Sequence, residues 1–215
     1  MLSISGLSKS FNRRKVLNNL SLEIKTGETA IFMGNNGAGK TTLLRIIAKI
    51  MTPDNGKIIF ENNNILKGSP SSRKNILYIG HSPGMYASLS ALDNLKFALE
   101  IRNNPLAENK IKYELERFGL LEQINDPISF YSQGMLQRLK LTYAELSNWN
   151  LLLLDEPFSG LDKSSEDQID LVLKNWKNMR QYPAGVLGAG VSGQGVCELL
   201  EWFEPGRSDQ TRWWS

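Results

Sequence analysis

A glycine-rich segment near the amino end, residues 34–42, holds the side chains best suited to bind phosphate. Residues 34–41 read GNNGAGKT and fit G-x-x-x-x-G-K-[ST], after an apolar stretch at 29–33 that predicts a strand. Glycines let backbone N–H groups turn inward around phosphate oxygens, and the helix expected to begin near Lys40 adds its positive dipole end. Lys40 can approach the β- and γ-phosphates of a nucleotide, and the Thr41 hydroxyl can bind Mg²⁺. The predicted nucleotide-binding residues are Gly34, Asn35, Asn36, Gly37, Ala38, Gly39, Lys40, Thr41 and Thr42.

Two adjacent carboxylates, Asp155 and Glu156, follow a second apolar stretch at residues 151–154. The pattern predicts a buried strand that ends on the acids. Asp155 can hold Mg²⁺ through water, and Glu156 can polarise the water molecule that attacks phosphorus. Two acids alone more often belong to a solvated loop, but the upstream phosphate loop favours a catalytic pair. The two motifs together indicate a P-loop NTPase, a class that includes kinases, GTPases and motor ATPases.

A third feature is the segment YSQGMLQR at residues 131–138, which precedes the acidic strand. Ser132 is a good N-cap for the helix that the following residues predict. Its hydroxyl and the first N–H groups of that helix would form a second anion site. A capped helix without a ligand is the simpler interpretation of the segment alone, whereas its position before the acidic strand favours the anion site.

This combination resembles the ATP-binding cassette (ABC) family over about residues 1–175. The family signature usually reads LSGGQxQR, and residues 131–138 keep its serine, second glycine, last glutamine and arginine but depart from it at Gln133 and Met135. The resemblance implies that MgATP is held in a head-to-tail dimer, where the signature segment of a second ATP-binding subunit meets the γ-phosphate. It assigns further ATP contacts to Ser132, Gly134, Gln137, Asp162 of the SGLD segment at 159–162, Phe11 as the adenine-stacking aromatic, and Val16.

His81 lies where the family normally has a glutamine that senses the γ-phosphate and Mg²⁺ and links to the membrane partner. The stretches YIGHSPG at 78–84 and LSALDNL at 89–95 resemble one branch, the ATP-binding subunits of haem exporters in cytochrome c maturation. That branch shares the shortened signature Y-S-x-G-M-x-Q-R. The resemblance implies that His81 acts with Glu156 in catalysis, that haem export is energised, and that an integral-membrane transporter subunit is the partner. A neutral surface imidazole is the alternative for His81.

Apolar periodicity indicates strands and turns in the first quarter, including a turn at 53–56, and helices over residues 90–144. With the resemblance, it predicts an α/β fold: a P-loop NTPase (ABC ATPase) core with an antiparallel β subdomain and an α-helical signature subdomain. We expect one ATP-binding domain over residues 1–215. Its expected parts are an ATPase core at 1–82 and 148–182, the helical subdomain at 83–147, and an atypical tail at 183–215 for which no secondary structure is predicted.

The composition limits the possible functions further. With 41% hydrophobic and 22% charged residues, the chain has the balance of a soluble globular protein. A single cysteine, Cys197, and a single histidine exclude an intramolecular disulfide, Cys- or His-cluster zinc sites and Ser-His-Asp chemistry. A net charge of +3 without a dense basic cluster argues against nucleic acid as a partner.

The chain shows neither a signal-peptide pattern nor an apolar run longer than residues 151–154. We therefore expect a peripheral protein, on the cytoplasmic face of a bacterial inner membrane or the matrix face of the mitochondrial inner membrane.

One feature of the family is missing. ABC ATPases usually carry a histidine after a short strand beyond the acidic pair, whereas residues 185–192 read GVLGAGVS and no histidine follows His81. The chain is then either a nucleotide-binding regulatory subunit with weak or no hydrolysis, or it carries a tail that is not the native one, as after a shift of reading frame. Soluble ABC ATPases of DNA repair or translation carry coiled-coil insertions or a second cassette, for which there is no room. The leading prediction is the ATP-binding and hydrolysing subunit of an ABC transporter complex that exports haem for cytochrome c biogenesis.

Overall fold

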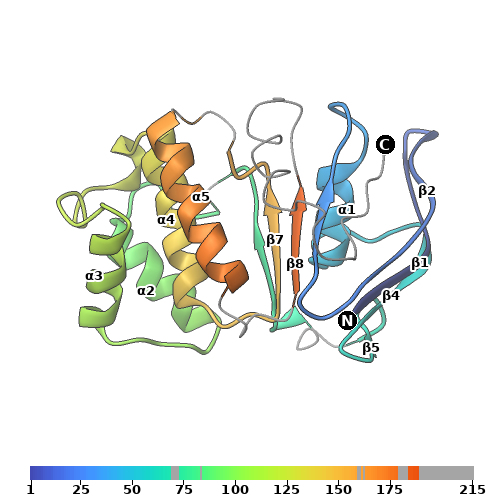
Figure 1. Cartoon of the computed structure of the whole chain (residues 1–215), viewed down its shortest axis with the longest axis horizontal. Helices are drawn as coiled ribbons and strands as arrows, with labels where there is room; N and C mark the ends of the chain where they lie inside the picture. The colour runs from blue at the N-terminus through green and yellow to red at the C-terminus, as the bar shows by residue number, and fades with distance from the viewer. Residues whose placement is uncertain (69–72, 83, 159–160, 162, 179–183, 189–215) are drawn as a thin grey trace. The chain divides into compact units, whose positions relative to one another are not determined.

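The computed structural model describes residues 1–68, 73–82, 84–158, 161, 163–178 and 184–188, which are coloured in Figure 1. Contacts divide the chain into two compact units, and each is described by itself. The first comprises the described residues of Met1–Tyr78, Trp149–Ser159 and Trp176–Ser215, and the second those of Ile79–Asn148 and Gly160–Asn175. The strands are β1 (Leu2–Phe11), β2 (Arg14–Ile24), β3 (Thr29–Phe32), β4 (Asn55–Phe60), β5 (Asn63–Asn64), β6 (Ile76–Ile79), β7 (Leu151–Asp155) and β8 (Ala184–Gly188). The helices are α1 (Lys40–Ile47), α2 (Ala91–Ile101), α3 (Glu108–Arg117), α4 (Gln133–Leu146) and α5 (Lys163–Asn178), with a 3₁₀ turn at Ile128–Phe130.

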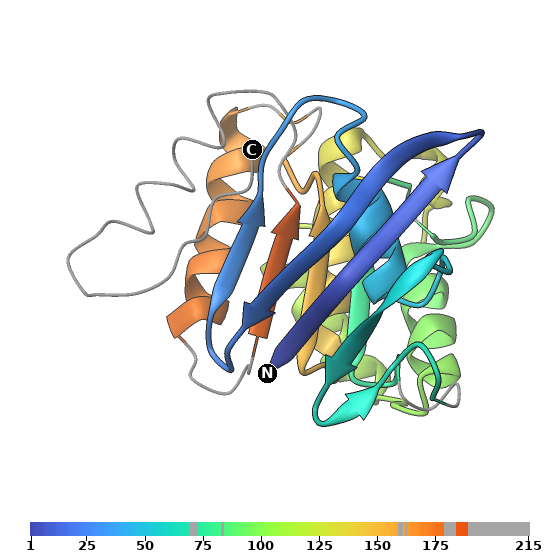
Figure 2. The same ribbon diagram turned by 90° about the vertical axis from the view of Figure 1, so that its right-hand side faces the viewer.

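An antiparallel sheet in the order β2-β1-β4-β5 forms one part of the first unit, and its long strands β1 and β2 run side by side in Figure 2. Alternation along β1 buries Leu2 and Ile4 on the core face. Asn12 and Arg13, which join β1 to β2, both have positive φ, as a tight two-residue hairpin turn requires. The sheet confirms the predicted antiparallel β subdomain.

The turn predicted over residues 53–56 is wrong in its second half, because β4 already begins at Asn55. Gly56 has a φ of +109, and a Cβ on it would lie 2.6 Å from the Cα of Leu7 in β1. The pairing of β1 with β4 shifts register next to it, between Ser5 and Ser8. This glycine therefore permits a close approach of two backbones at an irregularity in the sheet.

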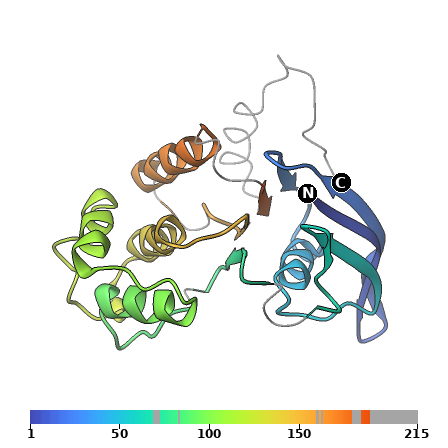
Figure 3. The same ribbon diagram turned by 90° about the horizontal axis from the view of Figure 1, so that it is seen from below.

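A second sheet has the order β3-β8-β7-β6, and β8 pairs in parallel with both β3 and β7. All five residues of β7 are buried, as expected for a strand inside a parallel sheet. Helix α1 lies between the two sheets (Figure 3), where Leu44, Ile46 and Ile47 are buried in the common core. Strand β8 lies between β3 and β7 in this sheet. No secondary structure was predicted for the tail, and its residues Ala184–Gly188 correct that prediction by forming this strand. Its glycines, which are rare in strands, removed the strand signal from the sequence.

The second unit contains α2, α3 and α4, which pack against one another. Its buried side chains follow the predicted helical period, namely Leu92, Leu95, Leu99, Ile111 and Leu115. The arrangement confirms the predicted α/β class with an antiparallel sheet and a helical subdomain. None of the helices in the described part of the chain has both the length and the apolar character needed to cross a membrane.

Candidate nucleotide site

The glycine-rich loop of residues 34–42 follows β3 and includes the first residues of α1. Gly39 is the N-cap of α1, with a φ of 98 and no side-chain cap. A Cβ on Gly39 would lie 2.9 Å from Cγ1 of Val16 and 3.1 Å from the carbonyl oxygen of Val16, so a larger residue requires displacement of β2. No cap side chain binds the first N–H groups of α1, and such groups suit an anion.

The ammonium group of Lys40 lies across this loop. Its Nζ donates to the carbonyl oxygens of Gly34 at 2.6 Å and Asn35 at 3.1 Å, and the residue is buried. Hydrogen bonds from these carbonyls offset part of the cost of burying the charge. A phosphate oxygen in the loop could replace the carbonyls, because hydrogen bonds between two charged groups are the stronger ones.

Thr41 and Asp155 meet although 114 positions separate them in the sequence. The Thr41 hydroxyl donates to Oδ1 of Asp155 at 2.9 Å, and Asp155 is the buried last residue of β7. Hydroxyl and carboxylate oxygens are ligands that Mg²⁺ prefers, and the ion is usually held by one or two protein groups together with nucleotide phosphates. The donor chemistry of the pair therefore fits magnesium. Within the described residues, no cluster of three or more His, Cys, Asp or Glu side chains could hold a metal ion.

Tyr78 on β6 adds a contact that sequence reasoning missed. Its hydroxyl donates to Oδ2 of Asp155 at 2.8 Å, so each carboxylate oxygen accepts a hydrogen bond from a hydroxyl. Burial raises the pKa of Tyr78 to about 12; Asp155 contributes to the rise, while the nearby Arg45 opposes it. The hydroxyl is therefore protonated, and a donor, near neutral pH. The four-residue strand around Tyr78 carries no local signal that could have revealed a contact so distant in sequence.

Glu156 follows β7 directly and is partly buried, with a φ of 52. Such left-handed backbone is uncommon for residues other than glycine, and strain of this kind concentrates at functional sites.

Phe11 ends β1 with 42% of its surface exposed, and the ammonium of Lys9 lies 5.5 Å from its ring centre. The first unit thus brings Val16 of β2 next to Gly39 and Asp155 of β7 next to Thr41 in the phosphate loop.

The remaining predicted site residues belong to the second unit. Ser132 is the N-cap of α4, and its hydroxyl accepts a hydrogen bond from the backbone N–H of Met135 at 3.2 Å. Gln137 is buried, and its Nε2 has no hydrogen-bond partner among the described residues. Gly134 lies in the first turn of α4, and the His81 side chain is exposed after β6. Asp162 lies outside the described residues, and the ATP contacts expected of this whole group stay predictions.

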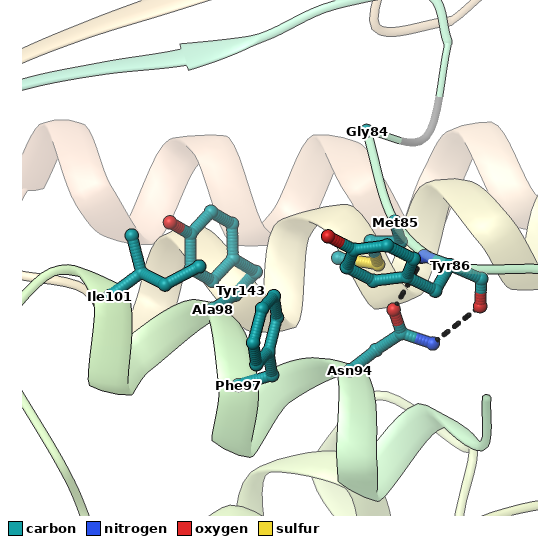
Figure 4. Close-up of a pocket in the computed structure, with 8 residues that line it drawn as sticks. All are labelled: Gly84, Met85, Tyr86, Asn94, Phe97, Ala98, Ile101 and Tyr143. Carbon is teal, nitrogen blue, oxygen red and sulfur yellow. Dashed lines mark hydrogen bonds between the residues drawn. The ribbon is translucent and has the colours of Figure 1, made fainter.

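The second unit also carries a groove of about 380 Å³ formed by residues 84–86, α2 and α4 (Figure 4). Asn94 fixes its edge, since its side chain accepts from the N–H of Tyr86 at 2.8 Å and donates to the carbonyl of Tyr86 at 3.0 Å. The rings of Tyr86 and Phe97 meet edge to face, with centres 5.3 Å apart. Tyr86, Phe97 and Ile101 are all largely exposed. A contiguous apolar surface of this kind is typical of an interaction site.

The parallel sheet, the loop at the start of α1 and the Thr41–Asp155 contact define a P-loop nucleotide-binding domain. The family model of the ABC transporter matches residues 17–159, and the chain belongs to that family as an ATP-binding subunit. Members of the family bind ATP, generally with Mg²⁺, and couple its hydrolysis to transport.

Three curated relatives are similar over most of this chain. The cytochrome c biogenesis ATP-binding export protein CcmA of Vibrio vulnificus is 33% identical over 175 residues, which cover 81% of this chain and 85% of that protein. The lantibiotic transport ATP-binding protein SrtF of Streptococcus pyogenes is 33% identical over 83% of this chain and 76% of its own length. The molybdate/tungstate import ATP-binding protein WtpC of Pyrococcus horikoshii is 32% identical over 82% of this chain and 51% of its own length. Their names differ in cargo and direction, so the similarity establishes a transporter ATP-binding subunit and leaves its cargo open.

Solved structures agree with this assignment. An ATP-binding subunit of an ABC transporter is 26% identical with a TM-score of 0.75, over 89% of this chain and 80% of that one. A dimeric bacterial ABC transporter cassette superposes with a TM-score of 0.78 over 89% of each chain, at 22% identity, which shows the fold alone. The predicted ABC ATPase fold is confirmed.

Proposed function

We propose that this subunit binds and hydrolyses MgATP to energise a haem-export step of cytochrome c biogenesis. The observation that carries the ATPase part is the 2.9 Å contact between Thr41 and Asp155, which joins the phosphate loop to the end of β7. Support for the cargo comes from the His81 stretch and from the similarity to CcmA, which is named for cytochrome c biogenesis.

The loop would bind the triphosphate through backbone N–H groups from Gly34 to Gly39 and through the first turn of α1. Lys40 would turn its ammonium from the loop carbonyls to the β- and γ-phosphates. Phe11 offers an exposed ring for the adenine face, and Val16 lines the site beside Gly39.

Thr41 and Asp155 would hold Mg²⁺, which neutralises charge on the phosphate oxygens when bound. Glu156, which follows β7 with a left-handed backbone, would accept a proton from the attacking water. Tyr78, bonded to the second oxygen of Asp155, restrains the rotation of that carboxylate.

A second ATP-binding subunit would complete the site. Ser132, Gly134 and Gln137 at the start of α4 would meet the γ-phosphate bound by the opposite subunit, with Asp162 beside them. Ser132 supports this proposal, because it is exposed at the N-terminus of α4, and helix N-termini favour anions. The dimeric cassette among the structural relatives supports a dimer, while the head-to-tail arrangement rests on the family resemblance of residues 131–138.

An integral-membrane subunit would dock on the groove of the second unit, at a cytoplasmic or matrix membrane face. Replacing exposed Ile101 by Glu should abolish co-purification with that subunit and leave ATP affinity unchanged. Tyr113→Glu on α3 is the matched control, since Tyr113 is 59% exposed against 66% for Ile101 and lies outside the groove. Loss of the complex in both variants, or in neither, would reject the groove as the docking surface.

The test of hydrolysis is phosphate release by wild type and by Glu156→Gln. We expect the variant to bind ATP normally and to lose turnover by at least about 100-fold, the usual contribution of a general base. In reconstituted complexes, haem should stimulate wild-type turnover, whereas a lantibiotic peptide or molybdate should not. Stimulation by either of those cargoes instead of haem would contradict the haem assignment and leave the ATPase assignment intact.

A nucleotide-binding regulatory subunit is the second candidate, favoured by the lack of any histidine after His81. It predicts ATP binding with equal, background-level phosphate release from wild type and Glu156→Gln.

A further inference from the structure

Lys140 lies in the middle of α4, and only 6% of the residue is exposed. Its Nζ donates to the carbonyl oxygen of Gly80 at 3.0 Å and to that of His81 at 3.2 Å. All three residues belong to the second unit. A buried cation thus connects the helix that Ser132 opens to the backbone of the His81 stretch.

Burial of an ammonium is costly unless hydrogen bonds compensate for the lost water. Two carbonyl oxygens directed at one Nζ provide such compensation, and they also fix the orientation of the two peptide groups that carry them. The backbone around His81 is therefore held although the imidazole itself is exposed.

An apolar side chain of similar length at position 140 would remove both hydrogen bonds. The carbonyls of Gly80 and His81 would then turn toward water, because an unsatisfied buried acceptor costs more than an exposed one. The fold of α4 would change little, since its N-cap and its buried apolar face do not depend on Lys140.

We propose that Lys140 is a positioning residue that holds His81 in place to respond to bound nucleotide. The inference rests on the proposed ATPase function together with the role that the family resemblance implies for His81, namely sensing of the γ-phosphate. Ser132 and Lys140 are eight residues apart on one helix, about 12 Å along its axis, so the helix forms a rigid link between the signature segment and the His81 backbone.

The experiment uses the imidazole proton resonance of His81, which is unique because the chain has a single histidine. The full-length protein is saturated with the magnesium complex of a non-hydrolysable ATP analogue, and affinity is measured separately by calorimetry. In wild type the His81 signal should shift on saturation. In Lys140→Met the analogue should bind with unchanged affinity, while most of the shift of the His81 resonance is lost. The kcat for ATP should fall about tenfold and KM should stay within about twofold, because a misplaced group far from the bound substrate slows turnover more than it weakens binding.

Thr142→Val is the matched control. Thr142 is buried on the same helix, and its hydroxyl donates to the carbonyl of Arg138 at 2.9 Å, so the variant loses a buried hydrogen bond that does not involve His81. It should keep the wild-type shift. Should Lys140→Met fail to fold, Lys140→Gln is used with the same expectation, because its shorter amide does not reach both carbonyls.

A full wild-type shift in the folded Lys140 variant would overturn the inference and leave the proposed function standing. Equal loss of the shift in Thr142→Val would also overturn the inference, because both variants would then act through a general loosening of α4. If wild type binds the analogue without any shift, the sensing role of His81 falls together with that of Lys140. If wild type does not bind the analogue, the proposed ATPase itself is wrong.

Discussion

The N-termini of α1 and α4 are built in opposite ways, although both are predicted to face phosphate. α1 starts after Gly39, which contributes no cap side chain. α4 starts after Ser132, whose hydroxyl already accepts the N–H of Met135. One helix start leaves its N–H groups to a ligand, and the other supplies its own acceptor.

The surroundings enlarge this difference. At α1, a buried lysine and the Thr41–Asp155 pair lie at the same helix start, so charge and metal ligands are assembled within one unit. At α4, the Ser132 hydroxyl already accepts from the N–H of Met135, so a phosphate must share or displace this cap. We therefore expect α1 to bind MgATP in an isolated subunit, and α4 to bind phosphate only when a second subunit presents it.

The largest effect should come from Gly39→Ala. The left-handed backbone costs about 1–2 kcal/mol for alanine, and overpacking against Val16 adds about 1–3 kcal/mol. If the loop relaxes to avoid this strain, ATP binding must restore the strained conformation, and the summed cost of about 2–5 kcal/mol should lower the affinity about 30-fold or more by the rule of 1.4 kcal/mol per tenfold. Isothermal titration with MgATP measures the change.

Gly27→Ala is the control for backbone strain alone. Gly27 also has positive φ, but a Cβ there would meet nothing within 4 Å, and the residue is outside the loop. It should lower the melting temperature without changing ATP affinity. An equal loss of affinity in the two variants would mean that the open start of α1 has no special part in binding.

Ser132→Ala tests the self-capped helix and should have the next largest effect. Loss of an N-cap destabilises a protein by about 1 kcal/mol. Ser90→Ala provides a matched cap removal, because the Ser90 hydroxyl accepts from the N–H of Asp93 at the start of α2. Both variants should unfold at similar urea concentrations and bind ATP as wild type does, whereas only Ser132→Ala should reduce dimer-dependent phosphate release, by about tenfold for one lost phosphate hydrogen bond. Similar turnover in the two variants would limit Ser132 to its capping role.

The sequence predicted those features of the two helix starts and of β7 that depend on local residue patterns. Residues 34–41 predicted a loop before a helix at Lys40, Ser132 predicted a cap, and residues 151–154 predicted a buried strand, because periodicity and capping act over a few residues. The roles of these residues toward ATP remain predictions.

Contacts between distant segments were not predictable in this way. Tyr78 reaches Asp155 across 77 positions and Lys140 reaches Gly80 across 60, and no pattern in the neighbouring residues indicates either contact. The β8 strand was not predicted for a related reason. Gly185 and Gly188 have no intrinsic preference for a strand, and the conformation is determined by pairing with β3 on one side and β7 on the other.

Tyr78→Phe changes the surroundings of α1 and should have the smallest effect of these variants. Asp155 keeps its bond to Thr41 but loses the second hydroxyl. Mn²⁺, used as a spectroscopic substitute for Mg²⁺, should then bind the ATP complex about threefold more weakly, because the lost hydrogen bond orients the carboxylate and does not itself contact the metal. Tyr113→Phe removes a hydroxyl from an exposed ring and is the control. Paramagnetic resonance of free Mn²⁺ reports the affinity, and equal affinities in both variants would show that the Thr41 contact alone holds the carboxylate.

The same hydroxyl predicts how stability changes at alkaline pH. The pKa of Tyr78 is raised from 10.0 to about 12, chiefly by burial, so the neutral phenol is favoured in the folded state. Its contribution to the free energy of unfolding is complete below pH 10.0 and is lost as pH rises toward about 12. Denaturant unfolding between these two values should therefore show a steeper loss of stability in wild type than in Tyr78→Phe. Parallel slopes would mean that the phenol ionises as readily in the folded chain as in the unfolded one, which is incompatible with a hydroxyl that donates to a buried carboxylate.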